Sequence, residues 1–163
     1  MFPRELRVAA AFVLFTLILS PISTPAVAAN STPYPGTQTI KTQSGFDALW
    51  KKLEAAVKAN GMFVVIRASA SRGMAGRDIK IPGNLVIGVY RNDFAVRMLE
   101  ASIPAGIEAP LRFYVTENGD GTASLTYRKP SAVFALYKSD YLDKMAAELD
   151  AIWVKIVTQA TGR

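Results

Sequence analysis

The chain has 163 residues, a net charge of +6, and neither cysteine nor histidine. Without cysteine there is no disulfide, thiol nucleophile or thiolate metal site, and without histidine there is no imidazole base, imidazole metal ligand or serine–histidine triad. The sequence also lacks the G-x-S-x-G, S-x-x-K, P-loop and G-x-G-x-x-G motifs. We therefore expect a non-catalytic protein without metal or cofactor. The alternative is a small metal-independent enzyme that uses lysine, tyrosine or carboxylate groups.

The first 29 residues have the pattern of a secretory signal peptide. Arg4 and Arg7 precede an apolar run of 12 residues, 8–19, and small residues follow at 26–29. We expect cleavage after Ala28 or Ala29 and a periplasmic or secreted protein. A retained membrane anchor is the alternative, but the run is shorter than the ~20 apolar residues that a spanning helix needs. In that compartment a basic protein is expected to meet anionic small molecules or envelope polymers, and not nucleic acid.

The rest of the chain is expected to form a linker, 30–36, and a single domain, 37–160. Its elements follow from hydrophobic periodicity, capping residues and turn residues. They are a strand over 37–43, a helix capped by Ser44 that ends at Asn60-Gly61, strands over 62–66 and 85–90, a short helix from Asn92 or Asp93 with Phe94, Met98 and Leu99 inward, strands over 111–117 and 122–128, a helical turn over 131–138, and a last helix from Ser139 or Asp140. This β-α-β-β-α-β-β-α order predicts an α+β two-layer sandwich. Its mixed sheet has about five strands, with helices mainly on one face.

Two of these strands, 62–66 and 85–90, are apolar on both faces, which is typical of central strands. If the helices all cover one face of the sheet, the other face needs a partner. A second copy of the chain is the simplest one, so we expect a homodimer and no transmembrane segment after the signal peptide is removed.

The segment between Glu117 and Thr122 predicts a β-hairpin whose register can be fixed by side-chain polarity. A three-residue loop, 119–121, with Gly121 in the left-handed conformation places Phe113 opposite Tyr127. That register puts the apolar side chains of both strands on one face and the polar side chains on the other, whereas a two- or four-residue loop mixes them.

The same register places Arg112 opposite Arg128, with Tyr114 on the same face. Like charges that face each other across strands are destabilising unless something compensates them. Solvent, an acidic neighbour, a dimer contact or a bound anion can do so, and all four remain open. The two arginines and Tyr114 are therefore candidate residues for binding a small anion or a partner.

A second candidate lies in the segment 72–77, where Arg72 and Arg77 flank Gly73 and Gly76. Glycines allow backbone N–H groups to converge on an anion, and two arginines add positive charge. The alternative is a flexible connection whose glycines only shape a turn.

Residues 104–112 (PAGIEAPLR), with Asp120-Gly121 in the hairpin and Tyr127-x-x-Pro130 after it, resemble the domain-of-unknown-function 302 family. The resemblance implies a compact α/β domain, often dimeric, with no accepted biochemical activity. The segment 88–93 lacks the Gly-Asn-Pro turn that is frequent in that family. Together these observations favour an exported ligand-binding or accessory module, with a structural envelope protein as the further alternative. A pocket with converging polar groups favours a binding module, and a flat apolar patch favours a structural protein.

Overall fold

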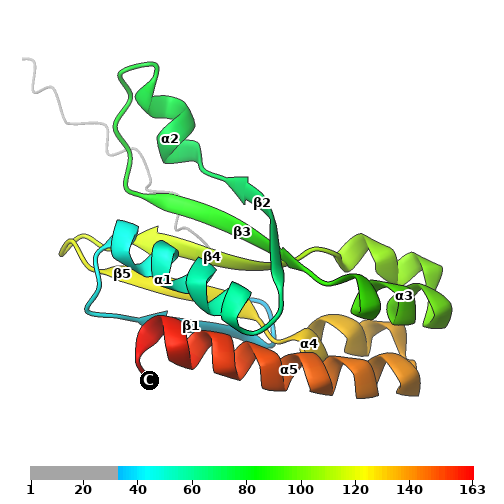
Figure 1. Ribbon diagram of the computed structural model, residues 1–163. Coiled ribbons are helices and arrows are strands. Elements are labelled where there is room, and N and C mark those ends of the chain that lie inside the picture. The colour runs from blue at the N-terminus through cyan, green and yellow to red at the C-terminus, as the bar shows by residue number, and fades with distance from the viewer. Residues whose placement is uncertain (1–32) are drawn as a thin grey trace, which may run out of the picture. The chain divides into compact units, whose positions relative to one another are not determined.

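The computed structural model describes residues 33–163 (Figure 1), so the predicted signal peptide and the first part of the linker lie outside the described residues. The elements are β1 (Thr37–Lys41), α1 (Phe46–Ala59), β2 (Phe63–Ala68), α2 (Ala70–Ala75), β3 (Asn84–Tyr90), α3 (Asn92–Ala101), the 3-10 helix η1 (Ile103–Glu108), β4 (Leu111–Glu117), β5 (Ala123–Arg128), α4 (Pro130–Phe134), the 3-10 helix η2 (Ala135–Tyr137) and α5 (Asp140–Thr161). No helix in this part of the chain is long and apolar enough to cross a membrane.

The five strands form one sheet in the order β1-β5-β4-β3-β2, and each neighbouring pair is antiparallel. The predicted two-layer α+β fold is confirmed, but the sheet is antiparallel and not mixed. The reason lies in the connections. The chain passes from one edge of the sheet to the other through α1, while α2 and α3 project beyond the ends of the strands they join (Figure 1). Each returning strand therefore runs against its neighbour.

Helices α1 and α5 pack side by side and bury their apolar stripes against one face of the sheet (Figure 1). Leu53 of α1 is fully buried, and the indole of Trp153 on α5 stacks on Phe113 of β4 with ring centroids 5.3 Å apart. Ser139 caps α5 as predicted, because its Oγ accepts a hydrogen bond from the backbone N–H of Leu142 at 3.4 Å. This layer of helix on sheet forms the core.

The hairpin of β4 and β5 has the predicted register. Phe113 pairs with Tyr127, and the N–H of Asn118 donates to the carbonyl of Thr122 at 2.8 Å. Gly121 closes the three-residue loop with a φ of +78°, the left-handed conformation that this loop requires.

Three sequence predictions are wrong in detail. The predicted cap of α1, Ser44, does not cap it, since the N-cap is Gly45 with no side-chain bond. Similarly, α3 starts at Asn92 with Arg91 as its N-cap, and Leu99 is 46% exposed and not inward. The strand β2, expected at the centre, is the edge strand of the sheet.

The edge position of β2 leaves apolar side chains in solvent. Phe63 and Ile66 lie opposite Tyr90 and Gly88 of β3, on the face of the sheet away from α1 and α5. They are 60% and 45% exposed, and Tyr114 of β4, on the same face, is 40% exposed. We call this surface, defined by Phe63, Ile66 and Tyr114, the open face. The apolar character on both sides of β2 therefore reflects an uncovered surface and not a buried position.

Candidate functional site

Arg112 and Arg128 lie together at one end of the β4–β5 hairpin. Phe113 of β4 pairs with Tyr127 of β5 in an antiparallel register. Arg112, which precedes Phe113, therefore lies opposite Arg128, which follows Tyr127. Both line a small surface pocket, together with Glu108, Leu111 and Val133; its empty space of about 310 Å³ includes open solvent. We call it the arginine pocket. The structure thus brings together the two arginines that the hairpin register singled out.

Neither arginine has a carboxylate oxygen within 4.0 Å among residues 33–163. The Nε of Arg128 is buried and has no hydrogen-bond partner there. A buried, unpaired donor is costly. Guanidinium groups bind carboxylate and phosphate oxygens through paired N–H donors. The arrangement can therefore hold a small anion.

Glu108 contributes one negative charge to the arginine pocket. Its Oε1 accepts a hydrogen bond from the hydroxyl of Tyr137 at 3.1 Å. The pKa of Tyr137 is raised, first by desolvation and then by this bond to the Glu108 carboxylate. The sequence did not connect Glu108 with the arginines, because it lies outside the hairpin on η1 and reaches them only through the fold. Two cations and one carboxylate leave the pocket with a net positive charge.

The other predicted residues lie elsewhere. Tyr114 sits two residues along the strand from Arg112, on the open face, and does not line the arginine pocket. Helix α2 carries Arg72, whose guanidinium lies 4.8 Å from the ring centre of Trp50, and Arg77 is exposed just beyond its end. Helix α2 is attached near Asn84, at the start of β3, whereas Arg112 pairs with Gly88 further along that strand.

An anion nest in the 72–77 segment would need free backbone N–H groups, and two of these groups have partners within the chain. The N–H of Gly73 donates to the carbonyl of Ser69 at 3.2 Å, and the N–H of Arg77 donates to the carbonyl of Met74 at 2.8 Å. Both N–H groups are thus used within or at the end of α2. An anion would find the side chains of Arg72 and Arg77 there, but not these backbone donors.

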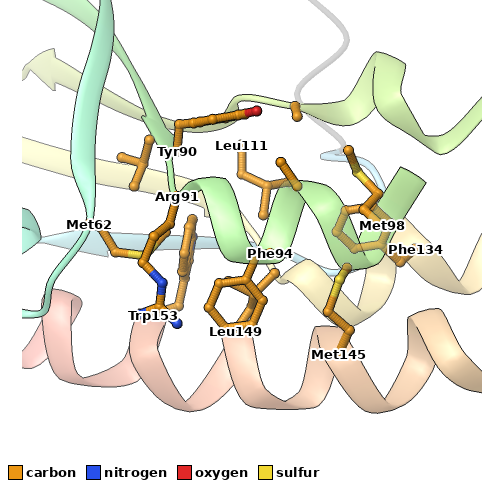
Figure 2. Close-up of a pocket in the computed structure, with 13 residues that line it drawn as sticks. Met62, Tyr90, Arg91, Phe94, Met98, Leu111, Phe134, Met145, Leu149 and Trp153 are labelled. Carbon is orange, nitrogen blue, oxygen red and sulfur yellow. The ribbon is translucent and has the colours of Figure 1, made fainter. Parts of the chain in front are cut away.

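A second pocket, which the sequence did not reveal, lies between α3, α5 and the adjoining ends of β3 and β4 (Figure 2). It contains about 340 Å³ of empty space, including its open mouth, and we call it the apolar pocket. Its walls are mostly aliphatic, aromatic and methionine side chains: Met62, Val89, Tyr90, Arg91, Phe94, Ala95, Met98, Ala109, Leu111, Phe134, Met145, Leu149 and Trp153. They are scattered from residue 62 to residue 153, so no local pattern could have found them.

Two side chains with N–H donors, Arg91 and Trp153, lie at one end of the apolar pocket, where Figure 2 shows them together with Met62. The indole Nε1 of Trp153 is buried and has no hydrogen-bond partner in the described residues. Arg91 donates to both carboxylate oxygens of Asp93, at 2.7 and 2.9 Å, and its hydrogen bonds lower the pKa of Asp93. The charge of Arg91 is therefore already compensated, whereas the donor of Trp153 is free.

These features define an α+β domain with one charged and one apolar pocket. The family model described as "Domain of unknown function DUF302" matches residues 38–160, so the chain belongs to this family and the predicted resemblance is confirmed. A solved structure, "Crystal structure of uncharacterized conserved protein DUF302 from Bacillus stearothermophilus", has a TM-score of 0.69 and 17% sequence identity to this chain. The match covers 77% of this chain and 98% of that one and shows a shared fold. A search of the curated proteins gives no match to this chain.

Proposed function

We propose that this protein is an exported, non-catalytic module that binds a small anion in the arginine pocket. The observation that carries the proposal is the pairing of Arg112 and Arg128 in one pocket with no carboxylate within 4.0 Å in the described residues. Two like charges held on neighbouring strands destabilise the fold, which is tolerated most readily where a ligand supplies the opposite charge. Small carboxylates and phosphate match the donors of the pocket.

Isothermal titration calorimetry with citrate and with inorganic phosphate tests the proposal. We expect Arg112→Gln and Arg128→Gln each to weaken binding about tenfold or more, because each removes one charged donor group. Arg163→Gln, at the exposed C-terminal end of the chain, is the matched control and should bind as the parent does. Unchanged affinity in both pocket variants would remove the arginine pocket as a site.

We propose further that two copies of the chain pair through the open face. Phe63, Ile66 and Tyr114 offer an apolar surface there, and Gly88, opposite Ile66, leaves room for the Ile66 side chain. The free edge of β2 is interrupted by an irregularity between Val64 and Ile66, which is a common protection against edge-to-edge pairing. We therefore expect the open faces of two copies to pack against each other, and not their β2 strands to pair edge to edge.

Light scattering at micromolar concentration tests the pairing. The parent protein should have the mass of a dimer, and Ile66→Asp should have the mass of a monomer. Val154→Asp is the matched control, since Val154 on α5 is 60% exposed and lies away from the open face. A parent protein with the mass of a monomer would refute the dimer.

Export is proposed from the N-terminal pattern alone. The intact mass of protein recovered from fractionated cells should correspond to a chain that begins at Ala29 or Asn30. A full-length chain retained in the membrane fraction would contradict it.

A further inference from the structure

We propose that the arginine pocket selects oxyanions that carry a proton of their own, such as inorganic phosphate, and that Glu108 is the residue that makes this selection. The inference rests on the anion binding proposed above and adds the class of ligand. Arg112 and Arg128 bind the charged oxygens of the ligand, and the carboxylate of Glu108 accepts a hydrogen bond from its protonated oxygen.

The arginine pocket contains both hydrogen-bond donors and a hydrogen-bond acceptor. The guanidinium groups of Arg112 and Arg128 can only donate, whereas the carboxylate of Glu108 can only accept. All three residues line the same pocket, which Glu108 reaches from η1. An anion without a proton satisfies the arginines but meets Glu108 as a like charge. An anion that also has an O–H group satisfies all three side chains.

Glu108 does not act as the counter-ion of either arginine. Carboxylates pair readily with guanidinium groups, yet no oxygen of Glu108 lies within 4.0 Å of a nitrogen of Arg112 or Arg128. Its Oε1 instead accepts a hydrogen bond from the hydroxyl of Tyr137 at 3.1 Å, and its Oε2 accepts none within residues 33–163. Tyr137 therefore positions a carboxylate that keeps one oxygen for a ligand lying between it and the arginines.

Tetrahedral oxyanions differ in whether they carry a proton at neutral pH. Inorganic phosphate and arsenate retain at least one, whereas sulfate and selenate have none. The four ions have the same shape and the same kind of acceptor oxygens, so the arginines do not distinguish the two pairs. Glu108 does, because sulfate or selenate beside it leaves two charged acceptors facing each other with no proton between them.

Calorimetry at pH 7 with these four ions tests the selection. The parent should bind phosphate and arsenate about tenfold or more tightly than sulfate and selenate, since the difference is one hydrogen bond to a charged group. Glu108→Gln removes the charge and adds an N–H donor, so it should bind sulfate more tightly than the parent does and lose most of the preference for phosphate. Glu117→Gln, at the opposite end of β4, makes the same change in charge and should keep the preference of the parent.

Tyr137→Phe tests the positioning of Glu108. Without the hydroxyl, the carboxylate is free to turn toward the arginines and compete with the ligand, so phosphate and sulfate should both bind less tightly than to the parent. In the Glu108→Gln background, the same substitution should leave both affinities unchanged. A purely structural role of Tyr137 would instead weaken binding in both backgrounds, and that result would overturn the positioning.

The outcomes distinguish this inference from the proposal on which it rests. If the four ions bind with similar affinity and depend on Arg112 and Arg128, the selection is overturned and anion binding stands. The same holds if Glu108→Gln keeps the preference of the parent. If none of the ions binds, or if binding does not depend on the arginines, both are overturned. If Glu108→Gln loses its folded circular dichroism spectrum, the parent decides, and sulfate that binds as tightly as phosphate overturns the selection.

Discussion

Replacing Gly36 with alanine tests the close packing of the segment before β1 against α4. Gly36 has a φ of +78°, and its carbonyl accepts a hydrogen bond from the N–H of Lys129 at 2.9 Å, next to α4. A Cβ atom at this position would lie 2.1 Å from the Cβ of Ala132. The substitution therefore combines an unfavourable backbone conformation with a steric clash.

The two costs can be estimated separately. Holding an L-residue in the left-handed conformation costs about 1–2 kcal/mol. Forcing an extra methyl group into a packed contact costs about 1–3 kcal/mol. Alanine also restricts the unfolded chain, which offsets about 0.4–1 kcal/mol of the loss. We expect the free energy of unfolding to fall by roughly 1–5 kcal/mol in Gly36→Ala.

Urea unfolding followed by circular dichroism measures the effect, and two other glycines separate its causes. Gly121 has the same φ of +78° with no atom within 4 Å of an added Cβ, so Gly121→Ala should show the conformational cost alone. Gly119→Ala, with neither feature, should change stability little. Removing the clashing methyl group in Gly36→Ala/Ala132→Gly should cost less than the sum of the two single changes. The reasoning is refuted if Gly36→Ala costs no more than Gly121→Ala.

Two further predictions concern stability. Arg97 of α3 donates to both carboxylate oxygens of Glu148 on α5, at 2.8 and 2.7 Å, and these bonds lower the pKa of Glu148 from 4.5. Because the pKa of Glu148 is lower in the folded protein, its ionised carboxylate stabilises the fold above pH 4.5, and this stabilisation is lost as the pH falls through the folded-state pKa. The difference in thermal midpoint between the parent and Glu148→Gln should therefore become smaller in acid. A difference that does not change with pH would contradict this. The hydroxyl of Thr42, 2% exposed, donates to the carbonyl of Ala123 at 2.8 Å, so Thr42→Val should cost about 1–3 kcal/mol in urea unfolding. Thr39→Val, at an exposed position, should cost less than about 0.5 kcal/mol, and equal costs would count against the buried bond.

The register of the β4–β5 hairpin could be predicted because it depends on neighbours in sequence. Loop length and the alternation of polar and apolar residues leave one pairing that buries the apolar face. The position of Arg112 beside Arg128 follows directly from that pairing. The helix end at Asn60-Gly61 and the cap of α5 at Ser139 were also predictable, since both are local.

The apolar run at 62–66 shows where such reasoning fails. A strand that is apolar on both faces can be buried at the centre of a sheet or placed at an edge whose outer surface awaits a partner. The sequence does not distinguish these cases, because burial depends on which strands lie beside it. In this protein α1 carries the chain across the sheet, and β2 becomes an edge strand.

The sequence by itself determined the order of the strands and of the helices other than α2, the two-layer class and the pair of arginines, since each follows from spacing along the chain. Only the tertiary structure placed Glu108 beside that pair and assembled the apolar pocket. Residues far apart in sequence, such as Met62 and Trp153, meet there because α5 folds back over the sheet next to α1. The packing of distant elements decides such contacts, and periodicity carries no information about it.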